Sequence, residues 1–124
     1  MKIVHAGTNA EFLNKTFGTD YKAWMKCSWD YDRDTIVWMV ELDNKVRKGW
    51  RNTIVDANTV REEYVGLESD KLDSHVSLEK YRRIVVKKER RLGRYVILGT
   101  YRYDFQNSSE RNKRFWIKIS DEIM

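Results

Sequence analysis

The sequence predicts an α+β, mostly β domain: a small, strongly bent antiparallel or mixed sheet, or a partly open barrel, with one N-terminal helix. Three observations predict this class. A helix signal occurs near the N-terminus, period-two alternation of apolar residues dominates afterwards, and clusters of turn residues separate the alternating runs. The chain has 124 residues, 41% of them hydrophobic and none of them proline, so we expect a single domain over residues 1–124.

The helix is expected over Asn9–Phe17. Thr8 and Glu11 match a capping box, in which each side chain accepts a hydrogen bond from the other residue's backbone amide. Its apolar face consists of Phe12, Leu13 and Phe17. Gly18 is the expected stop, because glycine readily adopts the left-handed conformation that ends many helices.

Strand character recurs along the rest of the chain. The expected strands are Met1–Val4, Lys22–Trp29, Thr35–Leu42, Gly49–Val55, Thr59–Tyr64, Tyr81–Lys88, Arg94–Phe105 and a last strand around Phe115–Ile119. Thr35–Leu42 is strongly apolar and β-branched, which favours the centre of a sheet. Tyr81–Lys88 and Arg94–Phe105 are expected to pair as a long hairpin, with Asp43-Asn44-Lys45 as another hairpin turn and residues 65–77 as a loop.

On the second strand of the long hairpin, period-two alternation predicts that six residues share one face of the sheet. Its members are Tyr95, Ile97, Gly99, Tyr101, Tyr103 and Phe105.

Lysine and arginine concentrate in that hairpin. The formal net charge is +5, and from Lys80 to Arg94 the basic residues surround a single acid, Glu89. The candidate phosphate-binding residues are Arg82, Arg83, Lys87, Lys88, Arg90, Arg91 and Arg94. Segregated positive charge is typical of a face that meets nucleic acid. A solvated strand surface without a partner explains the same clustering equally well, so both interpretations stay open.

Several chemistries find no support in the sequence. Cys27 is the single cysteine, which excludes an internal disulfide and a cysteine-based zinc site, and its apolar neighbours predict a buried thiol. His5 and His75 lie far apart in the sequence, and the fingerprints of phosphate-binding loops and dinucleotide sites are missing. We therefore expect no cofactor and no metal. No signal peptide or membrane-length apolar run occurs, so a cytoplasmic protein without a membrane partner is expected.

One catalytic alternative remains open. Asp43-Asn44-Lys45 has the D-x-K spacing of many metal-dependent nucleases, and Asp34 is an upstream carboxylate. In such a site the carboxylates hold Mg²⁺ while the lysine acts on the attacking water. The motif is short, and a hairpin turn is the wrong context for it, so the sequence leans towards a protein that is not an enzyme.

The five tryptophans divide into two groups. Trp29 and Trp38 lie on apolar faces and are expected in the core, towards which Trp116 also leans. Trp24 and Trp50 instead lie beside lysine and arginine. Aromatic rings interleaved with basic residues are what a protein needs to stack bases and neutralise phosphates. Burial under a covering loop remains an equal alternative for these two.

The early helix, the tryptophans near loop ends and the late strand Gly93–Tyr101 together resemble domains of the PUA superfamily. This superfamily includes EVE and YTH domains and the DNA-reading modules of restriction enzymes. The resemblance covers about residues 22–119 and implies a PUA-like fold in which an aromatic cage holds a flipped or modified base and an Asp or Asn hydrogen-bonds its edge. The residues that it implicates are Trp24, Trp29, Trp50, Asp30 and Asn52.

The sequence therefore predicts a nucleic-acid-binding module associated with restriction, defence or RNA modification. A small protein-binding inhibitor or adaptor is the alternative, because aromatic and arginine-rich surfaces also mark protein interfaces. The metal-dependent nuclease with Asp34, Asp43 and Lys45 is the second alternative.

Overall fold

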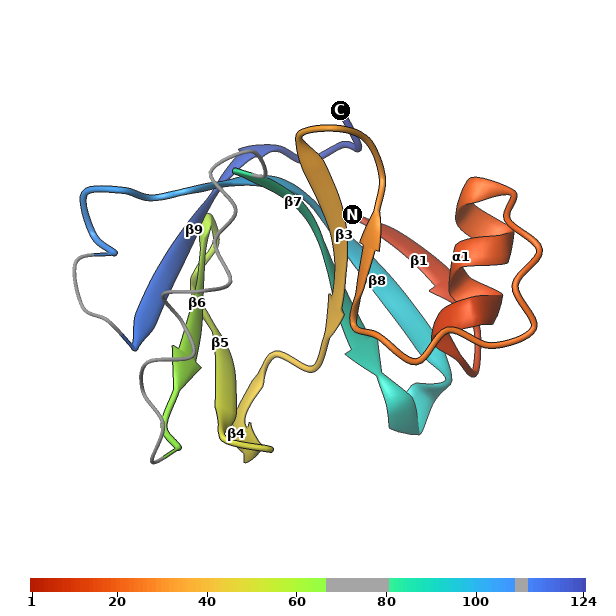
Figure 1. Cartoon of the computed structure of the whole chain (residues 1–124), viewed down its shortest axis with the longest axis horizontal. Helices are drawn as coiled ribbons and strands as arrows, with labels where there is room; N and C mark the ends of the chain where they lie inside the picture. Colours follow the sequence, from red (N-terminus) through yellow and green to blue (C-terminus); the bar gives the residue numbers. More distant parts are fainter. Residues whose placement is uncertain (67–80, 109–111) are drawn as a thin grey trace.

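In the computed structural model, residues 1–66, 81–108 and 112–124 are described, and they form nine strands and one α-helix (Figure 1). The strands are β1 (Lys2–His5), β2 (Ser28–Asp30), β3 (Thr35–Val40), β4 (Asp43–Arg47), β5 (Trp50–Asp56), β6 (Thr59–Tyr64), β7 (Arg82–Glu89), β8 (Arg94–Tyr103) and β9 (Lys113–Ser120). The helix is α1 (Asn9–Phe17), and a 3₁₀ turn, η2 (Arg90–Leu92), joins β7 to β8. The predicted mostly β class with one early helix is confirmed. Of the predicted loop at 65–77, only Val65 and Gly66 are among the described residues. His75 lies outside them.

The strands form one mixed sheet in the order β2-β3-β7-β8-β9-β6-β5-β4, with β1 paired to β8 beside this path. Strands β3 and β7 are parallel, and the other described pairs are antiparallel. Figure 1 shows that the sheet bends into an arch, with β4, β5, β6 and β9 on one side and β1, β3, β7 and β8 on the other. The two sides face each other, and the space between them contains the candidate site.

Helix α1 begins and ends where the sequence predicts. The Thr8 side chain accepts a hydrogen bond from the Glu11 amide, and Gly18 has a φ of 72°. The helix buries Phe12 and Leu13 completely against the outer face of β3, β7 and β8. Phe12 stacks on Tyr95 of β8, with ring centroids 4.8 Å apart. This packing fixes one side of the arch.

Strand β3 is buried on both faces, as its apolar sequence predicts. Val37 and Met39 belong to the outer core under α1, whereas Trp38 and Val40 belong to a second core inside the arch. Trp116 is also in the inner core and is 1% exposed, so it is a core residue as expected. The centre of the sheet therefore separates two hydrophobic cores.

A bulge in β8 corrects the prediction that its alternating residues share one face. Val85 pairs with Gly99 while Val86 pairs with Ile97, which leaves Leu98 as an extra residue in β8. Tyr95 and Ile97 pack in the outer core, but Tyr101 packs in the inner core. The extra residue reverses the alternation and increases the bend of the strand, because a bulge breaks the regular pleat.

Two further sequence predictions are wrong. Of the expected strand Lys22–Trp29, only Ser28 and Trp29 belong to a strand, β2; before it, Trp24 packs against the outer core and the side chain of Asn14 bonds to both backbone groups of Tyr21. Cys27, expected to be buried, is exposed in the segment before β2.

Asp43-Asn44-Lys45 begins β4 and is not a hairpin turn. The turn between β4 and β5 is Lys48-Gly49, where both residues have positive φ, as two-residue hairpin loops require.

Replacing Gly99 by alanine should destabilise the fold by about 2–4 kcal/mol, because strained backbone and close contacts add in that range. Gly99 has a φ of 138°, and a Cβ atom there would lie 2.2 Å from the Ser120 carbonyl oxygen. Urea denaturation of Gly99→Ala measures the loss. Gly7→Ala is the control and should stay near the wild-type value, because no atom lies within 4 Å of a Cβ at Gly7. Equal stability of the two variants would contradict this account.

Candidate functional site

A pocket of about 640 Å³ lies inside the arch, and we name it the cradle. Its lining comes from β2 and the segment before it, from β3 and the residue after it, from β4 to β6, from β7 to η2 and from β9. Its volume is within the range of small-molecule sites, which is roughly 300–1,000 Å³. The cradle is therefore large enough to take a nucleobase with a substituent.

The buried carboxylate of Glu62 organises the floor of the cradle. Arg83 donates from Nη1 to Glu62 Oε1 at 3.1 Å, and Trp116 Nε1 lies 3.3 Å from the same oxygen. The Arg83 guanidinium lies between two indole rings, 4.5 Å from the Trp38 centroid and 3.9 Å from the Trp116 centroid. Because Arg83 and Glu62 are 7% and 6% exposed, their charges compensate each other away from water.

A polar row runs from this floor to the wall of the cradle. Strand register places Asn52 of β5 opposite Glu62 of β6, and Glu62 opposite Arg114 of β9. The side-chain oxygen of Asn52 is buried, and no hydrogen-bond donor of the described residues reaches it. Two residues before Asn52, the half-buried ring of Trp50 makes an edge contact with Tyr64, with centroids 5.1 Å apart. One wall of the cradle thus combines an aromatic ring with hydrogen-bonding groups.

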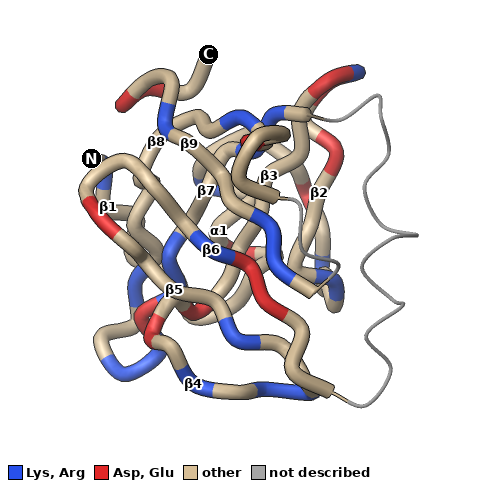
Figure 2. Tube along the Cα trace, turned by 90° about the vertical axis from the view of Figure 1, so that its left-hand side faces the viewer, with Lys and Arg blue, Asp and Glu red and all other residues tan. Residues whose placement is uncertain are grey.

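Positive charge dominates the lining. Seven basic residues and two acids, Glu41 and Glu62, line the cradle. The basic residues are Lys45, Arg47, Lys48, Arg83, Lys88, Arg90 and Arg114. Figure 2 shows basic positions along β4 and an acidic stretch in β6, where Glu62 lies. Among the described residues, no carboxylate forms an ion pair with Lys45, Lys48 or Lys88. These three lysines are the cations best placed to meet an anionic ligand.

Two arginines of the cradle are held by carboxylates instead. Glu41 pairs with Arg47 from β4 and, at 2.5 Å, with Arg90 from η2, so one carboxylate joins the two hairpins. Arg47 also donates from both terminal nitrogens to Asp43, at 2.6 and 2.7 Å. The hydrogen bonds from Arg47 lower the pKa of Asp43 to about 2. Burial, with a contribution from Arg90, lowers the pKa of Lys88.

The predicted phosphate-binding residues therefore have different environments. Lys88 and Arg90 line the cradle, whereas Arg83 is buried in its floor. Arg94 and Lys87 both pair with Glu89, at 2.8 and 3.7 Å. The two remaining members, Arg82 and Arg91, are exposed and do not line the cradle.

The predicted base-binding residues also separate. Trp50 and Asn52 lie together in the cradle. Trp24 lines a second, neighbouring pocket, and Asp30 is exposed on β2 and lines neither pocket. Trp29 packs against the outer core, where its indole nitrogen donates to the Tyr21 hydroxyl at 2.9 Å.

The residues of the nuclease alternative do not form a site. Asp34 precedes β3, whereas Asp43 and Lys45 lie in β4, beyond the other end of β3. Asp43 is engaged with Arg47, and Lys45 lines the cradle. Within residues 1–66, 81–108 and 112–124, no group of three or more His, Cys, Asp or Glu side chains could hold a metal ion.

Sequence reasoning missed Glu62 and gave Trp38 only a core role. A signal for Glu62 was present, because it alternates with Val60 and Tyr64 on the apolar face of a predicted strand. A carboxylate in that position needs a buried partner, which is a sign of a structural or functional polar cluster. The identity of its partners required the tertiary structure, since Arg83 is 21 residues away in the sequence.

Comparison with known proteins extends these observations. Residues 4–124 match the family model of the SRA domain, the SET and RING associated domain. Among solved structures, the chain is similar to "The 5-Hydroxymethylcytosine-Specific Restriction Enzyme AbaSI", with a TM-score of 0.69 and 20% sequence identity. That match covers 98% of this chain and 39% of the enzyme's chain, so this chain spans about two fifths of that protein. At this identity the likeness shows the fold alone. No curated protein matches the chain.

These findings confirm the resemblance to the PUA superfamily, because the SRA domain has a PUA-like fold. They also confirm the predicted nucleic-acid partner, since SRA domains bind DNA. In the described part of the chain, no helix is long and apolar enough to cross a membrane.

Replacing Glu62 by glutamine should destabilise the fold by about 3 kcal/mol, because removal of one charge leaves buried arginines uncompensated. Glu63→Gln is a matched control at the next position. The main partner of Glu63, Arg51, has a side chain that is 35% exposed, so water can compensate its charge and the loss should be smaller. Denaturant titration compares the two variants. A larger loss for Glu63→Gln would show that Glu62 does not organise the floor.

Asp43 should titrate near pH 2, because its pKa is lowered to about 2 from 3.8. A lowered pKa favours the ionised carboxylate in the folded state, so its contribution to stability is present above the unfolded pKa and is lost as pH falls through about 2. Carbon-13 NMR of the carboxyl group follows the titration. In Arg47→Met the midpoint should return towards 3.8, and an unchanged midpoint would assign the shift to another group.

Proposed function

Because this chain belongs to the SRA (SET and RING associated) domain family, we propose that it reads a modified cytosine in DNA by taking the base out of the stack into the cradle. The observation that carries this proposal is the wall formed by Trp50, Asn52 and Glu62 inside a base-sized pocket. Proteins that extrude a base stack it on aromatic side chains and hydrogen-bond its Watson–Crick edge. This wall offers both interactions.

The polar groups of the wall favour a base with an amino group. The Glu62 carboxylate accepts hydrogen bonds, and the buried Asn52 oxygen has no protein donor among the described residues. Cytosine carries a donor amino group at its edge, whereas thymine carries an acceptor oxygen there. The restriction enzyme with the similar fold is described as specific for 5-hydroxymethylcytosine, which supports a cytosine with a 5-substituent as the base.

Lys45, Lys48 and Lys88 are proposed to bind the DNA backbone around the extruded nucleotide. They line the cradle without carboxylate partners among the described residues, so they can neutralise phosphates without first breaking an ion pair. Contacts of this kind release counterions, and affinity should fall steeply as salt increases. Arg47 is held by Asp43 and Glu41, so we assign it to the framework of the cradle.

The proposed link to restriction involves protein outside the residues described. The similar restriction enzyme is longer, and 39% of its chain is covered by this match. In this proposal the chain supplies recognition of the modified base, and a nuclease supplied by a partner or a further segment cleaves the DNA.

Trp50→Ala should remove most of the preference for modified DNA. Fluorescence anisotropy with three labelled duplexes of one sequence, carrying cytosine, 5-methylcytosine or 5-hydroxymethylcytosine at one position, measures this preference at two salt concentrations. The wild type should bind a modified duplex more tightly. Loss of the Trp50 ring should weaken that complex by about 1–3 kcal/mol, the contribution of one stacked base.

Phe105→Ala is the control for this experiment, because Phe105 is an exposed aromatic residue outside the cradle. It should bind like the wild type. Equal affinity of the wild type for all three duplexes, or full preference in Trp50→Ala, would refute the proposed function. Insensitivity to salt would refute the assignment of the lysines to phosphates.

A further inference from the structure

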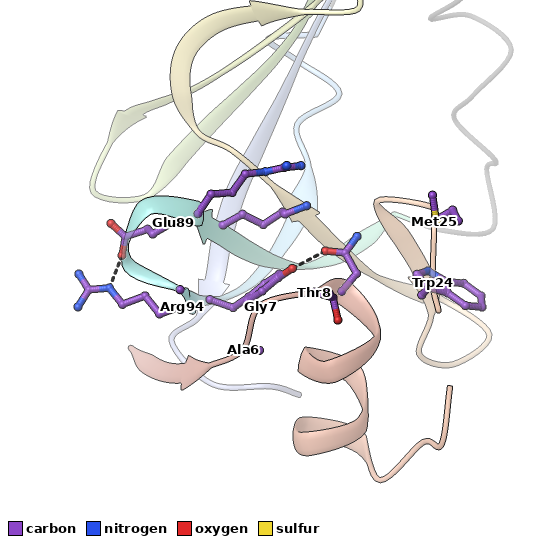
Figure 3. A pocket seen from close by; sticks show the side chains of 12 residues that line it. Ala6, Gly7, Thr8, Trp24, Met25, Glu89 and Arg94 are labelled. Carbon is purple, nitrogen blue, oxygen red and sulfur yellow. Dashed lines mark hydrogen bonds and ion pairs between the residues drawn. The ribbon is translucent and has the colours of Figure 1, made fainter. Parts of the chain in front are cut away.

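A second pocket, of about 470 Å³, adjoins the cradle. It lies between the turn that connects β1 to α1, the segment before β2 and the β7–β8 hairpin. Figure 3 shows Trp24 and Met25 on one side of it, with Glu89 and Arg94 on the other. Met25, Lys88 and Arg90 line both pockets and so form a shared wall. A ligand that leaves the cradle across this wall enters the second pocket.

Hydrogen bonds hold the sides of the second pocket in place. The Trp24 indole nitrogen donates to the Ser28 carbonyl at 3.1 Å. The Tyr95 hydroxyl donates to Asn9 Oδ1 at 2.7 Å, and Asn9 Nδ2 donates to the Lys26 carbonyl at 3.0 Å. The pocket therefore presents the half-buried ring of Trp24, whose indole nitrogen is already bonded to the protein, while Tyr95 is 4% exposed and lies at its base. Fixed aromatic surface of this kind suits a stacked base.

The charge of the second pocket concentrates at the shared wall. Arg94, on the far side, is paired with Glu89 at 2.8 Å. Arg90 has a side chain that is 73% exposed, and its Nε lies 2.5 Å from Glu41 in an ion pair. Lys88 has no carboxylate partner among the described residues, and its Nζ lies 5.9 Å from the Tyr95 ring centroid. Two cations thus stand between two pockets that each contain aromatic surface.

We propose that the second pocket is a nucleotide subsite, which takes the nucleotide next to the one whose base enters the cradle, while Lys88 and Arg90 bind the phosphate that joins them. This inference rests on the proposed function, because the cradle sets the position of the first nucleotide. Met25 is 92% exposed on the ridge between the pockets, so a bound dinucleotide would cover an apolar side chain that now faces water. Recognition then depends on the neighbouring nucleotide as well as on the modified base.

A titration with short nucleotides tests the subsite on the whole chain. The probes are 5-hydroxymethyl-deoxycytidine monophosphate and the two dinucleotides that extend it by one thymidine on the 5′ or the 3′ side. One dinucleotide should bind roughly 5- to 150-fold more tightly than the mononucleotide, the range expected for one additional stacked base. In nitrogen-15 NMR spectra, the Trp24 indole and the Gly7 amide should shift with that dinucleotide and not with the mononucleotide.

Gly7→Leu should abolish this gain. Gly7 lines the second pocket but not the cradle, and its Cβ position is open, so a leucine there has room and fills the subsite. Mononucleotide binding should stay unchanged, and Gly7→Ala should keep most of the gain because it adds one methyl group. Equal affinity for all three probes, or full gain in Gly7→Leu, overturns the subsite alone. If the mononucleotide and modified duplexes fail to bind the wild type, the proposed function and the subsite fall together.

Discussion

The ion pair between Glu62 and Arg83 is the contact on which the rest of this structure depends. Glu62 belongs to one side of the arch and Arg83 to the other, so their hydrogen bond of 3.1 Å closes the inner core across the bend. Two indole rings, from Trp38 and Trp116, cover the guanidinium on both sides. A buried charge is tolerated only with such compensation, and the same compensation leaves a polar floor in an otherwise apolar interior.

The bend of the sheet creates the cradle, which is the pocket above the floor formed by Glu62 and Arg83. The extra residue Leu98 changes the direction of β8, and Gly99 permits the close approach of β9 at the Ser120 carbonyl. The first half of β8 can then pair with β1 under the helix, while its second half pairs with β9 inside the arch. A flat sheet would present the polar row of β5, β6 and β9 to solvent. The arch turns that row towards β3 and β7, and a cradle results.

The cations of the cradle divide into those held by carboxylates and those without a carboxylate partner among the described residues. The arginines near carboxylates form structural ion pairs. Arg83 pairs with Glu62, and Arg47 pairs with Asp43 and Glu41. Lys45, Lys48 and Lys88 have no carboxylate partner among the described residues, and the proposed function assigns them to phosphates. Net basic composition by itself suggests only weak, unspecific binding. The separation of structural from available cations explains how a chain of modest net charge can combine a stable interior with a DNA-binding surface, as membership of the SRA family implies.

Local sequence determined the helix, most strands and the general chemistry of this protein. The Thr8 cap, the stop at Gly18 and the alternation in Thr59–Tyr64 depend on neighbouring residues, so they were predictable to the residue. Trp50 was singled out because it lies beside lysine and arginine, whereas Asn52 was implied only by the resemblance to the PUA superfamily, and both line the cradle. Tertiary structure alone decided that Glu62 meets Arg83, that Trp24 belongs to a different pocket, and that an extra residue reverses the alternation of β8. These features arise from pairing between strands that are distant in the sequence. The periodicity of one sequence does not determine which strands will pair.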